Sequence, residues 1–253
     1  MGKLYIVGIG PGDPLLRTQA SIQALMEATT VIGYRTYVDL VFDLLNGKNV
    51  TRSEMREELR RARLALTYAL DNGETVALIS DGDPQVYGMA SPTLELACLN
   101  NYDMGKIEII PGVTAALAAA SRLGAPLSMD FAVISLSDLL IPAQEILNRV
   151  EKASEGDFVI VFYNLINKEL LTKATGIIAK YRGPKTPVGI VRSAYRKGER
   201  VIVTDISRWA EFIDMIDMQT TLIIGNSKSY VCNNRIITPR GYLSKYGWFN
   251  GGH

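Results

Sequence analysis

The repeated pairing of a short apolar run with a glycine-containing turn constrains the fold of this chain more than any other feature. The first run, Leu4–Val7, leads into the turn VGIGPGDP. The second, Thr75–Ser80, is followed by DGDPQVYGM, and the third, Ile107–Ile110, by PGVT. Apolar residues at helical spacing follow these turns. Strands that alternate with helices in this way predict a mostly parallel sheet covered by helices.

The same alternation continues along the 253 residues and predicts an α/β protein. At Gly124-Ala125-Pro126 the composition turns to breaker residues, which predicts a boundary between two α/β domains, residues 1–125 and 126–253. The other strands are expected at 30–32, 131–136, 157–163, 187–191, 201–205 and 220–224. Helices are expected at 15–27, 37–45, 115–122, 142–152 and 168–181, along a charged segment that ends at residue 70, and from the second glycine turn to about residue 100; an amphipathic helix is expected at 209–218.

Composition excludes several classes of protein. A formal charge of +1 gives no reason to expect nucleic acid as a partner. No apolar run approaches the roughly 20 residues of a membrane span, and the start of the chain lacks a signal-peptide layout, so we expect no membrane partner and a cytoplasmic location. The single histidine, His253, ends a Gly-Gly-His tail that we expect to be disordered. Histidine-based catalysis and metal binding are therefore hard to build, and no metal site is predicted.

The first glycine turn is a poor phosphate cradle. Gly8 and Gly10 fit the dinucleotide fingerprint G-x-G-x-x-G, but its third glycine falls on Asp13. A carboxylate at the head of a helix repels a phosphate held there. Asp13 followed by Pro14 is instead typical of a helix N-cap with proline at the first helical position. Taken alone, this turn is also consistent with a purely structural role.

Three turns together give a stronger prediction. In open parallel sheets, ligands bind beyond the carboxyl ends of the strands, where these turns are expected to converge on one cleft. Two turns carry acids and none carries lysine, which favours a cationic or hydroxyl-rich ligand over a polyphosphate. Asp83 is placed to accept a hydrogen bond from a ribose or to hold an ammonium, and Thr114 to donate to a carboxylate.

The ordered motifs GIGPGD, GDPQVYGMA, PGVTAALAAA and DFAVISLSDLLIP resemble those of the tetrapyrrole methylase family. These are S-adenosylmethionine-dependent C-methyltransferases of cobalamin and siroheme synthesis. The runs YRTYVDLV, SLSDLLIP, TPVGIVRSA, TTLIIGNS and ITPRGY resemble the branch that methylates C-17 of precorrin-3B or cobalt-factor III with ring contraction. The resemblance spans residues 3–242. It implies two α/β domains with mostly parallel or mixed sheets, S-adenosyl-L-methionine in the cleft between them, a small-molecule tetrapyrrole substrate and a homodimer.

The resemblance also implies site residues, carried over motif by motif. Those expected at the cofactor are Pro11, Asp81, Gly82, Asp83, Val86, Thr114, Ala115, Tyr163, Asn164, Ala194 and Thr221. Those expected at the substrate are Tyr34, Arg35, Tyr87, Met89, Ser137 and Asp138. Methyl transfer from a sulfonium depends mainly on alignment. The additional proton movement of ring contraction leaves Asp138, Ser137 and Tyr87 as candidates, and no catalytic residue is assigned.

Departures from the family pattern keep other functions open. The second glycine turn has Asp81 and Pro84 where the C(17) branch usually has other residues, Met129 stands where that branch usually has histidine, and Leu165 where it usually has proline. The alternatives are methylation at another tetrapyrrole carbon, methylation of another acceptor as in diphthine synthase, and a non-catalytic ligand-binding relative. A nicotinamide oxidoreductase is disfavoured by Asp13.

Other conspicuous side chains have plain interpretations. The arginines between 52 and 63 alternate with glutamates at helical pairing distances, which indicates a solvated helix face. The basic cluster Arg192, Arg196, Lys197 and Arg200 has only Glu199 to compensate it, and either binds a substrate carboxylate or is an ordinary surface loop. Tyr34 and Tyr37 either pack or bind, and Met89 suits a core at least as well as a substrate contact. Cys98 and Cys232 lack metal-site spacing and are expected in the core.

Overall fold

The computed structural model describes residues 2–247, which divide into two compact units between Ala115 and Ala116. These are the N-terminal unit and the C-terminal unit. Both are built from strands and helices, so the predicted α/β class with mostly parallel or mixed sheets is confirmed. The predicted disordered tail at His253 lies outside the described residues. Within residues 2–247, every helix is too short or too polar for a membrane crossing.

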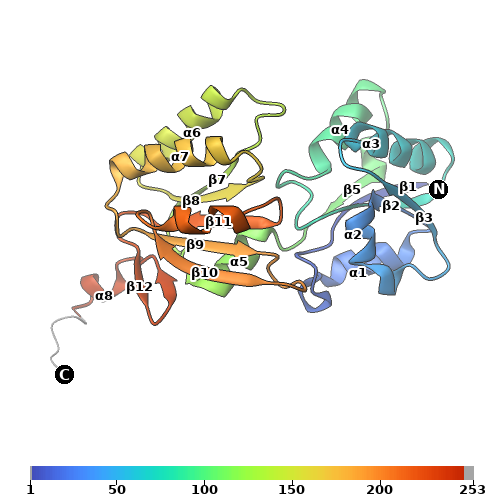
Figure 1. Ribbon diagram of the computed structural model, residues 1–253. Helices are drawn as coiled ribbons and strands as arrows, with labels where there is room; N and C mark the ends of the chain where they lie inside the picture. The colour runs from blue at the N-terminus through green and yellow to red at the C-terminus, as the bar shows by residue number, and fades with distance from the viewer. Residues whose placement is uncertain (1, 248–253) are drawn as a thin grey trace. The chain divides into compact units, whose positions relative to one another are not determined.

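The N-terminal unit is centred on a five-stranded sheet with the order β3-β2-β4-β1-β5 (Figure 1). All neighbouring strands pair in parallel, so their carboxyl ends lie at one edge of the sheet. The strands are β1 Lys3–Gly8, β2 Thr30–Tyr34, β3 Asn49–Ser53, β4 Thr75–Ser80 and β5 Ile107–Ile110. The helices are α1 Gln19–Glu27, α2 Arg35–Asp39, α3 Glu58–Leu66 and α4 Ala90–Leu99, with 3₁₀ turns at Pro14–Leu16, Phe42–Leu44 and Met104–Lys106 and a π-helical turn at Thr67–Asp71.

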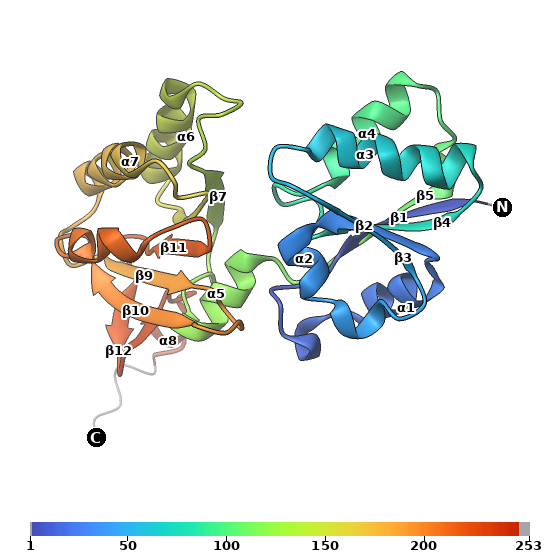
Figure 2. The same ribbon diagram turned by 45° about the vertical axis from the view of Figure 1, so that its right-hand side comes forward.

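Helices cover both faces of this sheet, with α1 and α2 on one face and α3 and α4 on the other (Figure 2). Side chains along a strand point alternately to the two faces. Tyr5 and Val7 of β1 therefore pack with α1 and α2, whereas Leu4 and Ile6 pack with α3 and α4. Burial on both faces explains why the central strands are continuous apolar runs in the sequence.

The C-terminal unit contains a mixed five-stranded sheet with the order β10-β9-β11-β8-β7 and a small sheet β12-β13-β6. Strands β7, β8 and β9 run in one direction and β10 and β11 in the other. Helices α6 and α7 pack on one face of the large sheet, and α5 packs on the other. The strands are β6 Gly124–Ala125, β7 Phe131–Ser135, β8 Val159–Tyr163, β9 Pro187–Arg192, β10 Arg200–Asp205, β11 Thr220–Ile224, β12 Tyr230–Cys232 and β13 Arg235–Ile237; the helices are α5 Ala115–Leu123, α6 Ala143–Glu155, α7 Lys168–Tyr181 and α8 Tyr242–Lys245, with a 3₁₀ helix at Trp209–Met215.

The division between the units falls at the start of α5, whereas the sequence placed it after residue 125. Helix α5 buries Ala116, Ala119 and Leu123 against the large sheet of the C-terminal unit, so its packing assigns it there. The breaker residues Gly124 and Ala125 form β6, which pairs with β13 inside the same unit. Composition alone put the division after residue 125, whereas packing assigns the preceding helix α5 to the C-terminal unit.

Several local predictions were wrong in detail. The expected helix over 37–45 is two short pieces, α2 and the 3₁₀ turn Phe42–Leu44. Strand β3, NVTRS, was not predicted because it is a polar edge strand without an apolar run. Cys98 and Cys232 are both exposed rather than in the core. Helix α4 buries Ala90, Thr93 and Ala97, which puts Cys98 off its packed face.

Candidate functional site

The three glycine turns of the N-terminal unit converge at the carboxyl edge of its sheet, as predicted. Gly10 and Gly82 form an isolated antiparallel bridge, in which each N–H donates to the other's carbonyl oxygen at 3.1 Å. This bridge joins the turn after β1 to the turn after β4. The turn after β5 is joined to them through Gly112, whose N–H donates to Asp83 Oδ2 at 3.1 Å.

The contact between these turns is close enough to exclude side chains. A Cβ placed on Gly112 would lie 2.1 Å from the carbonyl oxygen of Gly82. A Cβ on Gly8 would lie 2.7 Å from both that oxygen and the Gly112 nitrogen. Gly82 also has a φ of +57° and faces the Thr114 backbone, with 3.3 Å from its own hypothetical Cβ to Thr114 Cα. Glycine at these positions therefore permits a backbone approach that other residues would block.

Asp83 fixes the geometry of two turns. The carboxyl group is buried, and Oδ1 accepts from the Gln85 N–H at 2.8 Å while Oδ2 accepts from Gly112. Both oxygens are thus already used by backbone donors. Asp83 therefore braces the turns after β4 and β5, and its contact with a ribose or an ammonium stays a prediction.

The first turn ends as the sequence predicted. Asp13 caps the 3₁₀ helix Pro14–Leu16, accepting from the Leu15 N–H at 2.9 Å, with proline at the first helical position. Helix α1 begins later than predicted, after its own N-cap Thr18. Pro11 is buried between the glycine bridge and this cap. The turn therefore presents a carboxylate cap where a phosphate-binding loop would present free N–H groups.

The expected substrate residues of the N-terminal unit follow β2 and β4. Tyr34 ends β2 and packs edge-to-face with Tyr37, with ring centroids 5.1 Å apart. Arg35 is exposed and lies 3.6 Å from Glu54 Oε1. Tyr87 is 52% exposed and has a φ of +56°, which is unusual for an aromatic residue. Met89 belongs to the hydrophobic core, as its alternative interpretation predicted.

Arg61 was missed by the sequence analysis, which placed it on a solvated helix face. It is only 6% exposed. Its Nη1 donates to Ser53 Oγ at 3.1 Å and to the Glu54 carbonyl at 2.7 Å, and its Nη2 lies 3.9 Å from Met89 Sδ. Arg61 thus ties the end of β3 to the end of the turn after β4. An arginine among charged neighbours gives no sequence signal for such burial.

The expected residues of the C-terminal unit also share one edge of a sheet. Strands β7, β8 and β9 end there and β11 begins there, because Thr220 lies opposite Arg192. Asn164, with a φ of +59°, donates through Nδ2 to Ser135 Oγ at 2.8 Å. Asp138 Oδ2 accepts from Asn167 Nδ2 at 3.0 Å. The loops after β7 and β8 are therefore hydrogen-bonded to each other.

The remaining predicted residues of this edge are placed by their strands. Tyr163 ends β8, and its hydroxyl accepts from the Ala116 N–H at 2.6 Å, near the start of α5. Thr221 is buried within β11, and Ala194 lies in the loop after β9. Leu165, one of the departures from the family pattern, is fully buried in the core. The predicted residues of the C-terminal unit therefore lie at or near the same edge of its large sheet, and their contact with a ligand stays a prediction.

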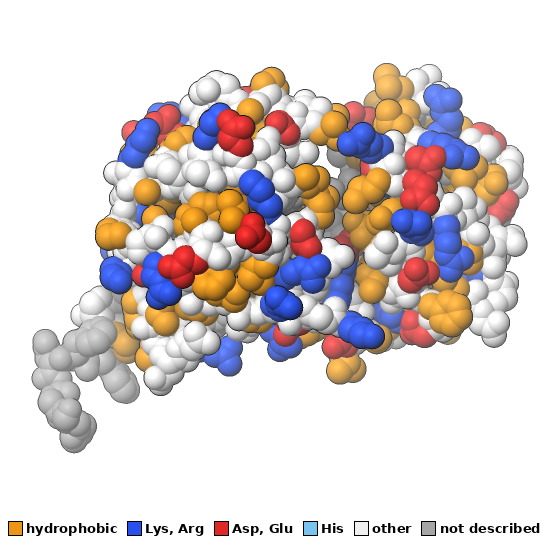
Figure 3. Space-filling view, viewed as in Figure 1, with side chains coloured by type: hydrophobic (Ala, Val, Ile, Leu, Met, Phe, Trp, Pro, Cys, Tyr) orange, Lys and Arg blue, Asp and Glu red, His pale blue; other side chains and the backbone are white. Residues whose placement is uncertain are grey.

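The expected basic cluster after β9 is partly neutralised. Arg192 pairs with Asp217, at 2.9 Å through Nε and 2.8 Å through Nη2. Glu199, which was expected to compensate the cluster, instead pairs with Arg122 of α5 at 2.7 Å. The hydrogen bond from Arg122, together with the backbone N–H of Tyr195, lowers the pKa of Glu199 below its usual 4.5. On the face seen in Figure 3, acidic and basic side chains are interspersed rather than segregated.

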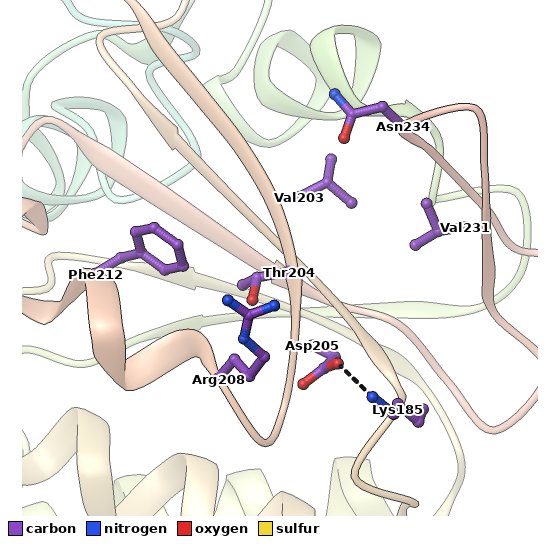
Figure 4. A pocket seen from close by; sticks show the side chains of 8 residues that line it. All are labelled: Lys185, Val203, Thr204, Asp205, Arg208, Phe212, Val231 and Asn234. Carbon is purple, nitrogen blue, oxygen red and sulfur yellow. Dashed lines mark ion pairs between the residues drawn. The ribbon is translucent and has the colours of Figure 1, made fainter.

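A cavity of about 340 Å³ lies beside β10 in the C-terminal unit, away from these loops (Figure 4). Val203, Phe212 and Val231 are among its apolar lining residues. Its charged side chains are paired locally, Lys185 with Asp205 at 3.7 Å and Arg208 with Glu211 at 3.0 Å. The cavity is lined by none of the predicted site residues.

Comparisons with known proteins define the class that this fold and these loops represent. The family model for tetrapyrrole (corrin/porphyrin) methylases matches residues 3–210, most of the chain. The chain therefore belongs to the tetrapyrrole methylase family, and the resemblance stated from its motifs is confirmed.

Two of the similar curated proteins are named for steps of cobalamin synthesis. The chain is 46% identical over 248 residues to the cobalamin biosynthesis protein CbiHC of Archaeoglobus fulgidus, covering 97% of this chain and 54% of that protein. It is 43% identical over 242 residues to the probable cobalt-factor III C(17)-methyltransferase of Salmonella typhimurium, covering 94% of this chain and 99% of that protein. The chain thus spans about half of the first relative and nearly all of the second.

Solved structures agree with this placement. The crystal structure of the methyltransferase CobJ matches with a TM-score of 0.87 at 32% identity, covering 94% of this chain and 100% of that one. A uroporphyrin-III C-methyltransferase from Thermus thermophilus, solved as a complex with S-adenosylhomocysteine, matches with a TM-score of 0.66 at 25% identity, covering 88% and 97%. Family and neighbours together indicate methylation that depends on S-adenosylmethionine.

Proposed function

We propose that the protein is an S-adenosylmethionine-dependent C-methyltransferase of cobalamin biosynthesis that methylates C-17 of cobalt-factor III or precorrin-3B with ring contraction. The observation that carries the proposal is the match at 43% identity to nearly the full length of a probable cobalt-factor III C(17)-methyltransferase. The similarity to CobJ at a TM-score of 0.87 supports it. Methylation at another tetrapyrrole carbon is the alternative within the same family.

The N-terminal loops fit a sulfonium cofactor better than a polyphosphate one. The three turns carry the acids Asp13, Asp81 and Asp83 and contain no lysine. Negative charge suits a cationic sulfonium and repels a diphosphate. We propose that the cofactor is held by Pro11, Asp81, Gly82, Asp83, Val86, Thr114 and Ala115 of these turns, and by Tyr163, Asn164, Ala194 and Thr221 at the ends of the strands in the C-terminal unit.

When bound, S-adenosylmethionine supplies an activated methyl group. The chain's own residues then need to hold acceptor and donor at roughly 3–3.5 Å, to orient them in line and to exclude water. The residues proposed to orient the tetrapyrrole are Tyr34, Arg35, Tyr87, Met89, Ser137 and Asp138. Arg35 carries an exposed guanidinium that suits a substrate carboxylate, since its contact with Glu54 is long and solvated.

Proton movement during ring contraction is assigned to no single residue. Asp138 is the exposed acid of the loop after β7, and Asn167 holds one of its oxygens in place at 3.0 Å. Ser137 and Tyr87 are the other candidates. The proposal also includes a homodimer in the cytoplasm.

The decisive experiment incubates the purified protein with cobalt-factor III or precorrin-3B and a labelled methyl donor, and follows product mass and absorption spectrum. A mass gain of one methyl group with the spectral change of ring contraction is expected. Calorimetry with S-adenosylhomocysteine and with NADH accompanies it. Binding of NADH alone would overturn the methylase assignment, and cofactor binding without a mass gain would favour a non-catalytic relative.

A further inference from the structure

The loop that follows β9 holds two residues in the left-handed backbone region, one on each side of Ala194. The φ angle is 51° at Ser193 and 59° at Tyr195. For a bulky residue this conformation costs of order 1 kcal/mol, and it persists only where the surroundings hold it. Such outliers concentrate at ligand-binding and catalytic sites. Ala194 lies between two such residues, and contacts with neighbouring residues hold both in this conformation.

Three side chains hold the second outlier, Tyr195: those of Ser121 and Arg122 in α5 and that of Glu199 in the loop. We call these three side chains and that of Tyr195 the 195 cluster. Glu199 Oε2 accepts from the backbone N–H of Tyr195 at 2.6 Å. Arg122 donates to both oxygens of Glu199 through Nε, at 3.0 and 2.9 Å, and to Oε1 through Nη2 at 2.7 Å. Its guanidinium lies 4.2 Å from the centre of the Tyr195 ring, and the Tyr195 hydroxyl lies 2.8 Å from Ser121 Oγ.

The first outlier is held independently from the strand side. The Ser193 N–H donates to the Gln219 carbonyl at 2.9 Å, and its hydroxyl donates to Gln219 Oε1 at 2.7 Å. Gln219 immediately precedes β11. The main chain of Ala194 is thus fixed from both sides, by Gln219 and by the 195 cluster.

We propose that the 195 cluster is a positioning device that keeps the main chain of Ala194 in its ligand-binding conformation. This inference rests on the proposed function, in which Ala194 contacts the cofactor. Glycine at position 195 would adopt the same φ without strain, but it would also adopt many other φ values, so the loop would be less ordered. Tyr195 is strained in this conformation, but the Arg122–Glu199 ion pair holds it there and makes the loop more rigid. A loop that is already ordered loses less conformational entropy on binding and therefore binds its ligand more tightly. The four side chains act through the backbone and are not themselves catalytic.

The test is calorimetric titration with S-adenosylhomocysteine, with melting temperature recorded for each variant. Glu199→Gln removes the charge that Arg122 and the Tyr195 N–H share, and should weaken binding about tenfold. Glu211→Gln is the matched control, since Glu211 also pairs with an arginine, Arg208, at 3.0 Å in the same unit. The control should bind within twofold of wild type.

A second substitution separates positioning from general destabilisation. Asparagine enters the left-handed region more readily than tyrosine, so adding Tyr195→Asn to Glu199→Gln should recover binding about threefold. A merely structural role for Glu199 predicts a further loss instead. Hydrogen exchange in Glu199→Gln should quicken in residues 193–199 and not in the sheets.

The outcomes distinguish the two proposals. A wild-type protein that binds no S-adenosylhomocysteine overturns the cofactor assignment and this inference with it. Wild-type binding with equal affinity of Glu199→Gln and Glu211→Gln overturns this inference alone. If Glu199→Gln does not fold, Arg122→Lys decides in the same way, because it keeps the charge and loses the bidentate geometry; unchanged affinity in that variant rejects the positioning role.

Discussion

Substituting Gly112 by alanine tests whether the three turns meet as closely as described. The added Cβ would lie 2.1 Å from the Gly82 carbonyl oxygen and 2.8 Å from the Gly8 carbonyl carbon, against 3.4 Å or more for ordinary contact. One turn must therefore move by about 1 Å. The Gly82 carbonyl cannot rotate away freely, because it accepts from the Gly10 N–H at 3.1 Å.

The expected magnitude follows from these two costs. Overpacking of a filled site costs about 1–3 kcal/mol, and losing the two Gly10–Gly82 hydrogen bonds costs about 1 kcal/mol each. Gly112→Ala should therefore lower the free energy of unfolding by about 3–5 kcal/mol. Misplacement of a binding loop by about 1 Å should also lower kcat/KM about 100-fold.

Urea denaturation measures the loss of stability and the methyl-transfer assay measures kcat/KM, while calorimetry with S-adenosylhomocysteine measures the affinity for the cofactor product. Gly176→Ala is the matched control, because Gly176 lies inside helix α7 with nothing within 4 Å of its hypothetical Cβ. That variant should stabilise the protein by about 0.5–1 kcal/mol and leave the affinity unchanged. If Gly112→Ala keeps wild-type stability and affinity, the close convergence of the turns is refuted.

Three further predictions concern individual side chains. Asp83→Ala removes two buried charge-assisted hydrogen bonds and should cost about 3 kcal/mol in urea denaturation; an effect below 1 kcal/mol would contradict the bracing role. Because Arg122 lowers the pKa of Glu199, the Glu199 carboxylate adds stability above pH 4.5, and this stability is lost as the pH falls through the lowered pKa. The difference in unfolding free energy between wild type and Glu199→Gln should therefore be present at pH 7 and vanish in strong acid. A difference that does not change with pH would refute the coupling. Arg61→Met should raise KM for the tetrapyrrole about tenfold without changing the affinity for S-adenosylhomocysteine, because Arg61 contacts Met89, a proposed substrate residue, and its hydrogen-bond partners Ser53, Glu54 and Glu58 are not among the proposed cofactor residues. Equal changes in both constants would show a general structural effect.

Much of the candidate site was visible in the sequence because its signals are local. Glycine turns directly after apolar runs place their residues at the ends of strands, and parallel strands bring those ends to one edge. The cap Asp13-Pro14 and the order of the motifs also needed no tertiary information. The limits of α7 and β11 agree with the structure for the same reason, since long apolar patterns define them.

Other features depended on partners that are distant in sequence. Asp83 accepts a hydrogen bond from Gly112, which lies in another turn, and no local pattern in the sequence indicates this partner. Glu199 was expected to balance its own basic loop, but it pairs with Arg122 on α5. The partner of each carboxylate is set only when the sheet brings separate segments together, because no local sequence pattern specifies which distant donor will lie beside it.

The sequence by itself determined the class of fold, the family and the sheet edges at which the proposed ligand-binding residues lie, because strand–turn–helix order and hydrophobic period are properties of neighbouring residues. Only the tertiary structure decided which side chains brace the loops, that Arg61 is buried, that the cysteines are exposed, and that α5 belongs with the second sheet. The physical reason is that burial and pairing are set by packing between segments, and packing energy depends on the whole fold.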